Sequence, residues 1–168
     1  SMEKAIDKSG NIVIISGDLK IRVNQERTDS FKRRIAASKG MHIIEHIVVP
    51  DIPDEVYKKT VECLKSHSNV DAIYLTSGMV IAVAKAINDT GFAGKVRLVG
   101  FDHSQEIFDN IKKGIIAAAI GQDPFGQGHD PIIWMYNHVV TGVPLPNEYM
   151  PCRLSVVNKD NVDNLIEV

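Results

Sequence analysis

The chain has 168 residues, of which 44% are apolar and 24% are charged, and its formal net charge at pH 7 is −2. This length is typical of one domain with its own core, and the near-neutral charge excludes a bulk electrostatic attraction to nucleic acid or anionic lipid. The longest apolar run, residues 115–120, is far shorter than the roughly 20 residues that span a bilayer. We therefore expect a globular protein without a membrane-spanning helix.

Apolar, β-branched runs alternate with amphipathic stretches along the chain, and this alternation is typical of a parallel sheet with crossover helices. Most of the runs are almost continuously apolar, as expected for strands that are covered on both faces. The predicted strands are residues 12–16, 43–49, 70–76, 96–101, 115–120 and 154–157. The predicted helices are residues 26–39, 54–66, 79–88 and 104–113. The sequence therefore predicts an α/β fold, an open parallel sheet with helices on both faces.

The regular pattern ends after Ile120. The segment GQDPFGQGHDP, residues 121–131, contains three glycines and two prolines, and we interpret it as a hinge before a long helix through Trp134. Pro131 should kink this helix or mark its start. The proline-rich segment TGVPLPNEYMP, residues 141–151, is predicted to be a surface connection to the last strand.

Polar residues follow four of the predicted strands. Ligands of an open parallel sheet bind beyond the carboxyl ends of its strands, so these residues are candidates for a binding site. Small hydroxyls, an amide and carboxylates suit a ligand with many hydroxyl groups, because carboxylates accept from hydroxyls and an amide both donates and accepts. The candidates are Ser16-Gly17-Asp18, Thr76-Ser77-Gly78, Asp102-His103 and Gly121-Gln122-Asp123. The alternative is that they are helix caps and turn residues.

Motifs for enzyme chemistry are missing from the sequence. It contains no GxGxxG or GxxxxGK[ST] loop for nucleotide phosphates, and no GxSxG nucleophile elbow. A phosphate-accepting receiver domain needs paired acids after the first strand and a lysine after a later one, and neither is evident. We therefore expect a binding protein rather than an enzyme, and no cofactor.

The segment HIIEH, residues 42–46, matches the inverted zinc-protease pattern HxxEH. Two histidines in that motif share one zinc only on a helix, where residues four apart are neighbours. The β-branched residues around it and Pro50 favour a strand, on which His42 and His46 lie about 13 Å apart. The other histidines and the two cysteines show no ligand spacing and no disulfide framework, so we expect no metal site.

Five segments, taken in order and with their spacing, resemble the second half of a type I periplasmic-binding-protein fold. Bacterial sugar-binding proteins share this fold with the effector domains of LacI-family transcription regulators. The segments are RTDSF (27–31), VDAIYLTSG (70–78), RLVGFD (97–102), GIIAAAIGQDPFGQG (114–128) and VVTGVPLP (139–146). The resemblance implies that a sugar or another small polar ligand binds in a cleft between two lobes, which close about a hinge.

The resemblance also implies four ligand-binding residues. Arg27 stands in the family's RxxGF pattern, Asp102 in its VGFD pattern, and Gln122 at the crossover between the lobes. Ser77 occupies the position where sugar binders often carry Asn, and this departure leaves the identity of the sugar open; Ser30 replaces the glycine of RxxGF. Even without the family, Arg27 and Asp102 can hold each other ionised and bind neighbouring hydroxyls from opposite sides.

The predicted elements account for only one of the two lobes of such a fold. We expect residues 11–120 to form the C-terminal lobe, and residues 121–152 to form a crossover segment with a helix that packs on the missing N-terminal lobe. Residues 153–168 are expected to be a terminal strand and tail, with the strand returning to, or close to, that first lobe. Without its cover, the apolar helix could also be buried in a homodimer or by a swapped partner.

Two functions are consistent with the resemblance. The first is the ligand-sensing domain of a cytoplasmic LacI-type regulator, which contacts DNA only through a separate domain outside this chain. The alternative is the solute-binding component of an ABC-type sugar transporter, located in the periplasm or outside the cell. The two unpaired cysteines favour the first, because disulfides are rare in the reducing cytoplasm. A helix-turn-helix upstream would indicate the regulator, and a signal peptide with a lipidation cysteine would indicate the transporter.

Overall fold

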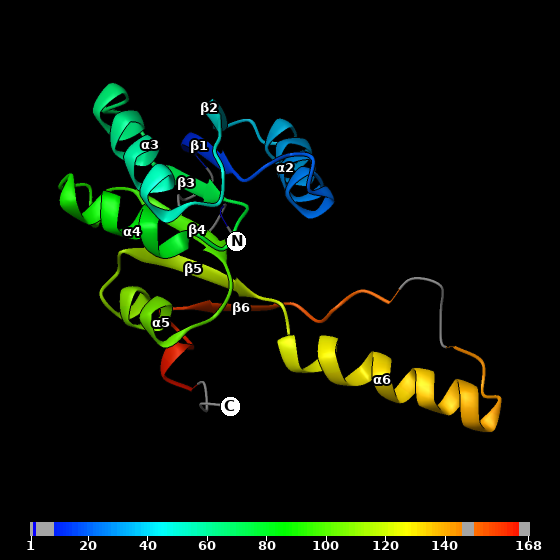
Figure 1. Cartoon of the computed structure of the whole chain (residues 1–168). Helices are drawn as coiled ribbons and strands as arrows, with labels where there is room; N and C mark the ends of the chain where they lie inside the picture. The colour runs from blue at the N-terminus through cyan, green and yellow to red at the C-terminus, as the bar shows by residue number, and fades with distance from the viewer. Residues whose placement is uncertain (1, 3–8, 146–149, 165–168) are drawn as a thin grey trace.

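The computed structural model describes residues 2, 9–145 and 150–164, and its centre is a six-stranded sheet with helices on both faces (Figure 1). The strands are β1 (Gly10–Ser16), β2 (Met41–Val48), β3 (Ala72–Leu75), β4 (Arg97–Phe101), β5 (Ile116–Gly121) and β6 (Ser155–Asn158). The helices are α2 (Arg22–Ala36), α3 (Pro53–Ser66), α4 (Val80–Asp89), α5 (Gln105–Lys112), α6 (Pro124–Thr141) and the short 3-10 helix η1 (Val162–Asn164). The predicted α/β class is confirmed.

The strands lie in the order β2-β1-β3-β4-β5-β6, and the first five of these run parallel. The last strand, β6, pairs antiparallel with β5, from Gly121 opposite Ser155 to Ala118 opposite Asn158. We expected this strand to return to, or close to, the first lobe, and that expectation is wrong. The described residues between α6 and β6 contain no helix, and β6 runs against β5 and extends the edge of the same sheet (Figure 1).

An apolar cluster covers each face of the sheet. The helices α3, α4 and α5 pack on one face and α2 packs on the other (Figure 1). Along β1, Val13 and Ile15 belong to the first cluster, whereas Ile12 and Ile14 belong to the second. This alternation is the period of two expected for a strand that is buried on both faces, and it fixes the sheet between the helices.

The residues that end α5 have the expected chemistry, and the segment HIIEH forms a strand as predicted. Ser104 caps α5, because its hydroxyl accepts a hydrogen bond from the backbone nitrogen of Ile107 at 3.3 Å. After this helix, Gly114 adopts a φ of 76°, a left-handed conformation that favours glycine. Residues 42–46 lie within β2, so their two histidines are on a strand as predicted.

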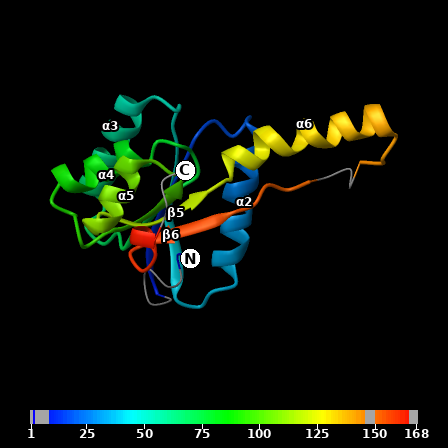
Figure 2. The same ribbon diagram turned by 90° about the horizontal axis from the view of Figure 1, so that it is seen from below.

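Helix α6 projects away from the sheet (Figures 1 and 2), and none of its residues is buried. It begins at Pro124, after Asp123, whose side chain accepts from the backbone nitrogen of Gly126 at 3.0 Å. Only the first three residues of the predicted hinge therefore precede the helix, and Pro131 lies inside it. Although α6 is 18 residues long, neither it nor another helix in the described ranges is long and apolar enough to cross a membrane.

The predicted connection at residues 141–151 is described only in part. Gly142 ends α6 with a φ of 71°, and its backbone nitrogen donates to the carbonyl of His138. Residues 146–149 lie outside the described residues, as do 165–168 of the predicted tail.

Candidate ligand-binding site

The carboxyl ends of β3, β4 and β5 meet a side chain from α2. Arg27 donates through Nη1 to the backbone carbonyl of Thr76 at 2.6 Å, and through Nη2 to Oε1 of Gln122 at 2.5 Å. Gln122 in turn donates from Nε2 to Oδ1 of Asp102 at 2.7 Å. The structure thus brings three of the four predicted residues together. We call Arg27, Gln122 and Asp102 the polar chain.

Aromatic rings support the guanidinium group of Arg27. Its Cζ lies 3.6 Å from the centroid of the Phe101 ring, and Tyr74 meets Phe101 edge-on before stacking on Phe31. Burial lowers the pKa of Arg27, while Tyr74 and Asp102 oppose that effect. The pKa of Tyr74 is raised by burial to about 12. Because arginine stays protonated in proteins, the site holds a fixed cation over an apolar platform.

The backbone is strained on both sides of Gln122. Asp102 has a φ of 75° and Asp123 a φ of 48°, which are the two positive values for residues other than glycine in the described part of the chain. Asp123 follows Gln122 in the sequence, and Asp102 accepts the hydrogen bond from the side-chain amide of Gln122. Such conformations are uncommon and cluster at functional sites, where surrounding contacts hold them. Here the backbone nitrogen of Asp102 donates to the carbonyl of Ile120 at 2.9 Å.

Two glycines leave space for the side chains at this edge. A Cβ atom at Gly78 would lie 2.7 Å from Oδ2 of Asp102, so a larger residue would displace the carboxylate. A Cβ atom at Gly121 would overlap the imidazole of His103. Burial lowers the pKa of His103, against a backbone hydrogen bond at Ala119 and the charge of Asp102, and the ring is therefore neutral at pH 7.

A cavity of about 450 Å³ adjoins the polar chain. It is lined by Asp102, His103, Gly121, Gln122, Pro124 and Gln127. This volume falls in the range of small-molecule sites. Gln127 also donates to the backbone carbonyl of Gln122, which joins the first turns of α6 to the end of β5. A carboxylate that accepts, an amide that does both and a guanidinium that donates can together hold a ligand with several hydroxyl groups.

The remaining predicted residues lie outside the polar chain. Ser77 is buried, and its hydroxyl has no hydrogen-bond partner among the described residues. At the end of β1, the Ser16 hydroxyl lies 2.8 Å from Nε2 of His46, and the Asp18 carboxylate accepts from the backbone nitrogen of Lys20. Asp18 is therefore a turn residue, which is the alternative that the sequence left open for it. Arg27 and Asp102 were predicted to hold each other ionised, but Gln122 bridges them.

Sequence reasoning missed two residues that position the site. Phe101 supplies the ring beneath Arg27, and its aromatic character directly before Asp102 could have indicated this platform. Asn24 is buried, accepts from the hydroxyl of Thr76 at 3.4 Å and donates to the backbone carbonyl of Asp18 at 3.3 Å. It lies three residues before Arg27, and this spacing places both on one helix face.

Known proteins share this architecture. A family model described as a periplasmic binding protein domain matches residues 1–142. A solved structure of GanP, a glucose-galactose binding protein from Geobacillus stearothermophilus, is 26% identical, with a TM-score of 0.86 over 95% of this chain and 57% of that chain. AraP, an arabinose binding protein from the same organism, is 22% identical, with a TM-score of 0.86 over 99% of this chain and 60% of that one.

A third solved relative carries a bound sugar. It is an ABC transporter periplasmic solute binding protein from Actinobacillus succinogenes 130z with bound D-allose, 22% identical, with a TM-score of 0.89. The match covers 98% of this chain and 57% of that one. No curated protein matches the sequence.

The extent of these matches defines what they show. This chain spans less than two thirds of the length of the three solved relatives, although each match covers nearly all of it. The two relatives that are 22% identical share the fold. The family model covers most of the sequence, residues 1–142 of 168. The chain belongs to the periplasmic binding protein domain family.

Proposed function

We propose that this chain is the C-terminal lobe of a sugar-binding protein of an ABC-type transporter. The ligand binds between this lobe and an N-terminal one, against Arg27, Gln122 and Asp102. The observation that carries the proposal is the polar chain itself, which gathers a cation, an amide and a carboxylate at the edge where parallel sheets bind ligands. The three relatives are binding proteins for sugars or solutes, which supports a sugar as the ligand.

The polar chain is suited to hydroxyl groups because its members are already oriented. Oδ1 of Asp102 accepts from Gln122, whereas Oδ2 points towards Gly78 and has no hydrogen-bond partner among the described residues. A sugar hydroxyl can donate to that oxygen while a neighbouring hydroxyl accepts from Gln122 or Arg27. Such charge-assisted bonds are stronger than neutral ones, and a buried site of this kind rejects analogues that lack the hydroxyl.

The proposal includes the predicted division of the chain. Residues 11–120 form the lobe, with β6 added at its edge, and residues 121–152 cross to the second lobe. The exposed apolar side chains of α6 indicate that another surface covers this helix. Phe125, Ile132 and Val139 are each more than two thirds exposed, and an apolar helix face of this kind is normally covered. The N-terminal lobe is the surface that we propose.

The LacI-type effector domain is the second candidate. Its specific support is that Cys63 and Cys152 are both free, which fits a reducing cytoplasm. The regulator would act as a homodimer and contact DNA through a separate domain, whereas the transporter component would lie in the periplasm or outside the cell. The relatives favour the transporter, because their names describe solute-binding or sugar-binding proteins. Fractionation of the source cells distinguishes the two locations.

Calorimetry with a panel of aldoses tests the proposal on the full-length protein, which includes the N-terminal lobe that we predict. We expect one sugar of the panel to bind, and Asp102→Ala to abolish the binding. The matched control is Asp160→Ala, since Asp160 is an exposed acid that follows β6, at the end of the sheet opposite to the site. Unchanged affinity in Asp102→Ala, or equal losses in both variants, would contradict the assignment of the site.

A further inference from the structure

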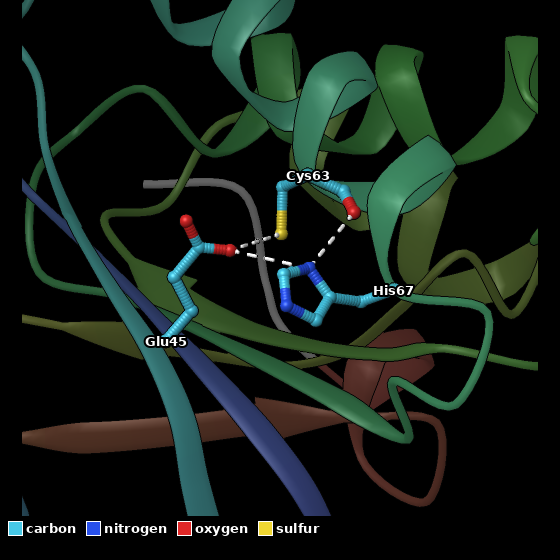
Figure 3. Close-up of side chains that lie close together, drawn as sticks. All are labelled: Glu45, Cys63 and His67. Carbon is cyan, nitrogen blue, oxygen red and sulfur yellow. Dashed lines mark hydrogen bonds and ion pairs between the residues drawn. The ribbon is translucent and has the colours of Figure 1, made fainter.

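Three potential metal ligands converge on the face of the sheet that α3 covers. Figure 3 shows Glu45 reaching from β2 towards Cys63 and His67 at the end of α3. The Sγ atom of Cys63 lies 3.3 Å from Oε2 of Glu45, and Nδ1 of His67 lies 3.4 Å from the same oxygen. All three ligand atoms lie within 4.8 Å of one another.

The two separations from Glu45 fit the edges of a coordination tetrahedron. With zinc bonded to sulfur at about 2.3 Å and to nitrogen and oxygen at about 2.0 Å, tetrahedral angles place neighbouring ligand atoms about 3.3–3.6 Å apart. The two measured separations from Oε2 of Glu45 are within or next to this range. We propose that Glu45, Cys63 and His67 bind one zinc ion, with water in the fourth position.

The surroundings allow a metal ion to enter. Cys63 is only 4% exposed, whereas the side chains of His67 and Glu45 are 33% and 37% exposed. A cavity of about 370 Å³ lies beside the three ligands, and Glu62, Ser66 and His46 also line it. The thiol is thus protected from solvent while the other two ligands remain accessible. The cavity has room for the water that would complete the coordination.

The chemistry of the ligands selects the class of metal. A thiolate and an imidazole favour zinc and similar transition metals over magnesium or calcium, which prefer oxygen ligands. In the free protein the Cys63 thiol donates a hydrogen bond to Glu45. On binding, the thiol proton leaves for the solvent and the neutral ring of His67 carries its proton on Nε2, so that Sγ, Nδ1 and Oε2 form three coordinate bonds to the ion. The thiolate and the carboxylate together balance the two positive charges of zinc.

Sequence reasoning overlooked one spacing that fits a metal site. Cys63 and His67 are four residues apart, a spacing that brings side chains together on a helix. Their partner Glu45 comes from β2, eighteen residues before Cys63. The expectation of no metal site rested on histidine and cysteine spacing alone, and only the packing of α3 on the sheet adds the carboxylate. An ion held there would join the edge strand β2 to the end of α3.

Zinc titration of the metal-free 168-residue chain tests this inference. Calorimetry in two buffers that differ in protonation enthalpy should show one zinc per chain and the release of about one proton, because one thiol is ionised. Cobalt in place of zinc should give a thiolate-to-metal charge-transfer absorption. His67→Gln should weaken zinc binding by about 100-fold or more, since it removes a direct ligand. Cys63→Ser should remove the cobalt absorption.

Matched variants at exposed positions serve as controls. Cys152→Ser and His129→Gln replace an exposed cysteine and an exposed histidine elsewhere in the chain, and both should bind zinc as the parent does. His67→Gln is the deciding variant, because its ring is partly exposed and the fold does not depend on it as it does on buried Cys63. The inference is overturned if the parent binds no zinc, or if His67→Gln binds as tightly as the parent. It is also overturned if a control variant loses the metal.

Discussion

The sheet with its covering helices and the projecting helix α6 differ in how completely they bury their apolar side chains. Leu75 and Leu98 in the sheet are 0% exposed, whereas Phe125 and Val139 on α6 are 70% and 73% exposed. A helix in a protein gains most of its stability from tertiary packing of its apolar face, and no residue of α6 is buried. Within the described residues, the sheet has the cover that its apolar side chains need, whereas α6 has none, and our proposal assigns that cover to a second lobe.

The polar chain lies where these two regions meet. Gln122 stands between the end of β5 and the start of α6, and it connects Arg27 to Asp102. A ligand that binds these residues therefore contacts the point from which α6 leaves the sheet. In our proposal, movement of the second lobe and occupation of the cleft are coupled at this residue.

Hydrogen exchange should show the largest difference between the two regions. Amides in the middle of β3 should exchange only through global unfolding, which costs roughly 5–15 kcal/mol in domains of this kind. Amides of α6 should exchange through local opening, several orders of magnitude faster. Exchange measured by mass spectrometry at two protein concentrations checks this. Equal protection of α6 and β3 would show that α6 is covered, and a rise in its protection with concentration would support the predicted homodimer.

Truncation of single side chains should show the next largest difference. Leu98→Ala removes a fully buried side chain from the cluster beneath α4 and should destabilise the chain by about 2–5 kcal/mol through lost burial and a cavity. Ile132→Ala removes one of similar size that is 68% exposed on α6, and should change stability by less than about 0.5 kcal/mol. Urea denaturation gives both values. Comparable losses would mean that α6 is packed in solution.

The contrast also explains how far the sequence could predict the fold. Apolar runs such as residues 12–16 identify strands wherever both faces are covered, because burial leaves a continuous pattern. The same pattern cannot tell to which sheet a strand belongs. The position of β6 was therefore missed, since pairing with β5 depends on the path of the chain after α6. The helical start at Pro124 was missed because glycine and proline outweighed the Asp123 cap.

For the site, residue identity could be predicted, but the bonds between residues could not. Arg27, Gln122 and Asp102 are 20 or more residues apart, and only the sheet order brings them into one polar chain. Gln122 lies between the two charges, and Asp102 has a strained backbone that no sequence pattern indicates. Ser77 was predicted from its place after a strand and from the family resemblance, but its side chain is buried and its hydroxyl has no hydrogen-bond partner among the described residues.

Replacing Arg27 should have an intermediate effect at the boundary of the two regions. Arg27→Met keeps an apolar stem over Phe101 but removes the hydrogen bonds to Thr76 and Gln122, and should cost about 1–3 kcal/mol. The control is Arg33→Met, because Arg33 is exposed and its side chain bonds to Ser30 on the surface of the same helix. Urea denaturation compares them. If Arg27→Met leaves the free energy of unfolding unchanged, the polar chain does not stabilise this end of the sheet.

The smallest effect should come from protonation of His46, which belongs to the sheet region. Burial lowers the pKa of His46, Lys32 lowers it further, and Asp29 opposes them. The Nδ1 atom faces the ammonium group of Lys32 at 3.0 Å, which needs a neutral ring as acceptor. The unfolded chain, with a histidine pKa of about 6.5, therefore binds more protons than the folded one between that value and the lowered pKa. The neutral ring of His46 therefore stabilises the folded state. This contribution to the free energy of unfolding is fully present above pH 6.5 and is lost as the pH falls through the folded pKa.

Urea midpoints at pH 7.5 and 5.5 measure that loss for the parent and two variants. The parent midpoint should fall at the lower pH, and His46→Gln should reduce the fall, because glutamine does not titrate and can still accept from Lys32. Some fall should remain, since burial also lowers the pKa of His103. The control is His129→Gln, because His129 lies on α6, which has no buried residue. Its midpoint should fall as far as that of the parent. If the urea midpoint of His46→Gln falls as far as that of the parent, the neutral ring of His46 contributes nothing to the stability of the sheet region.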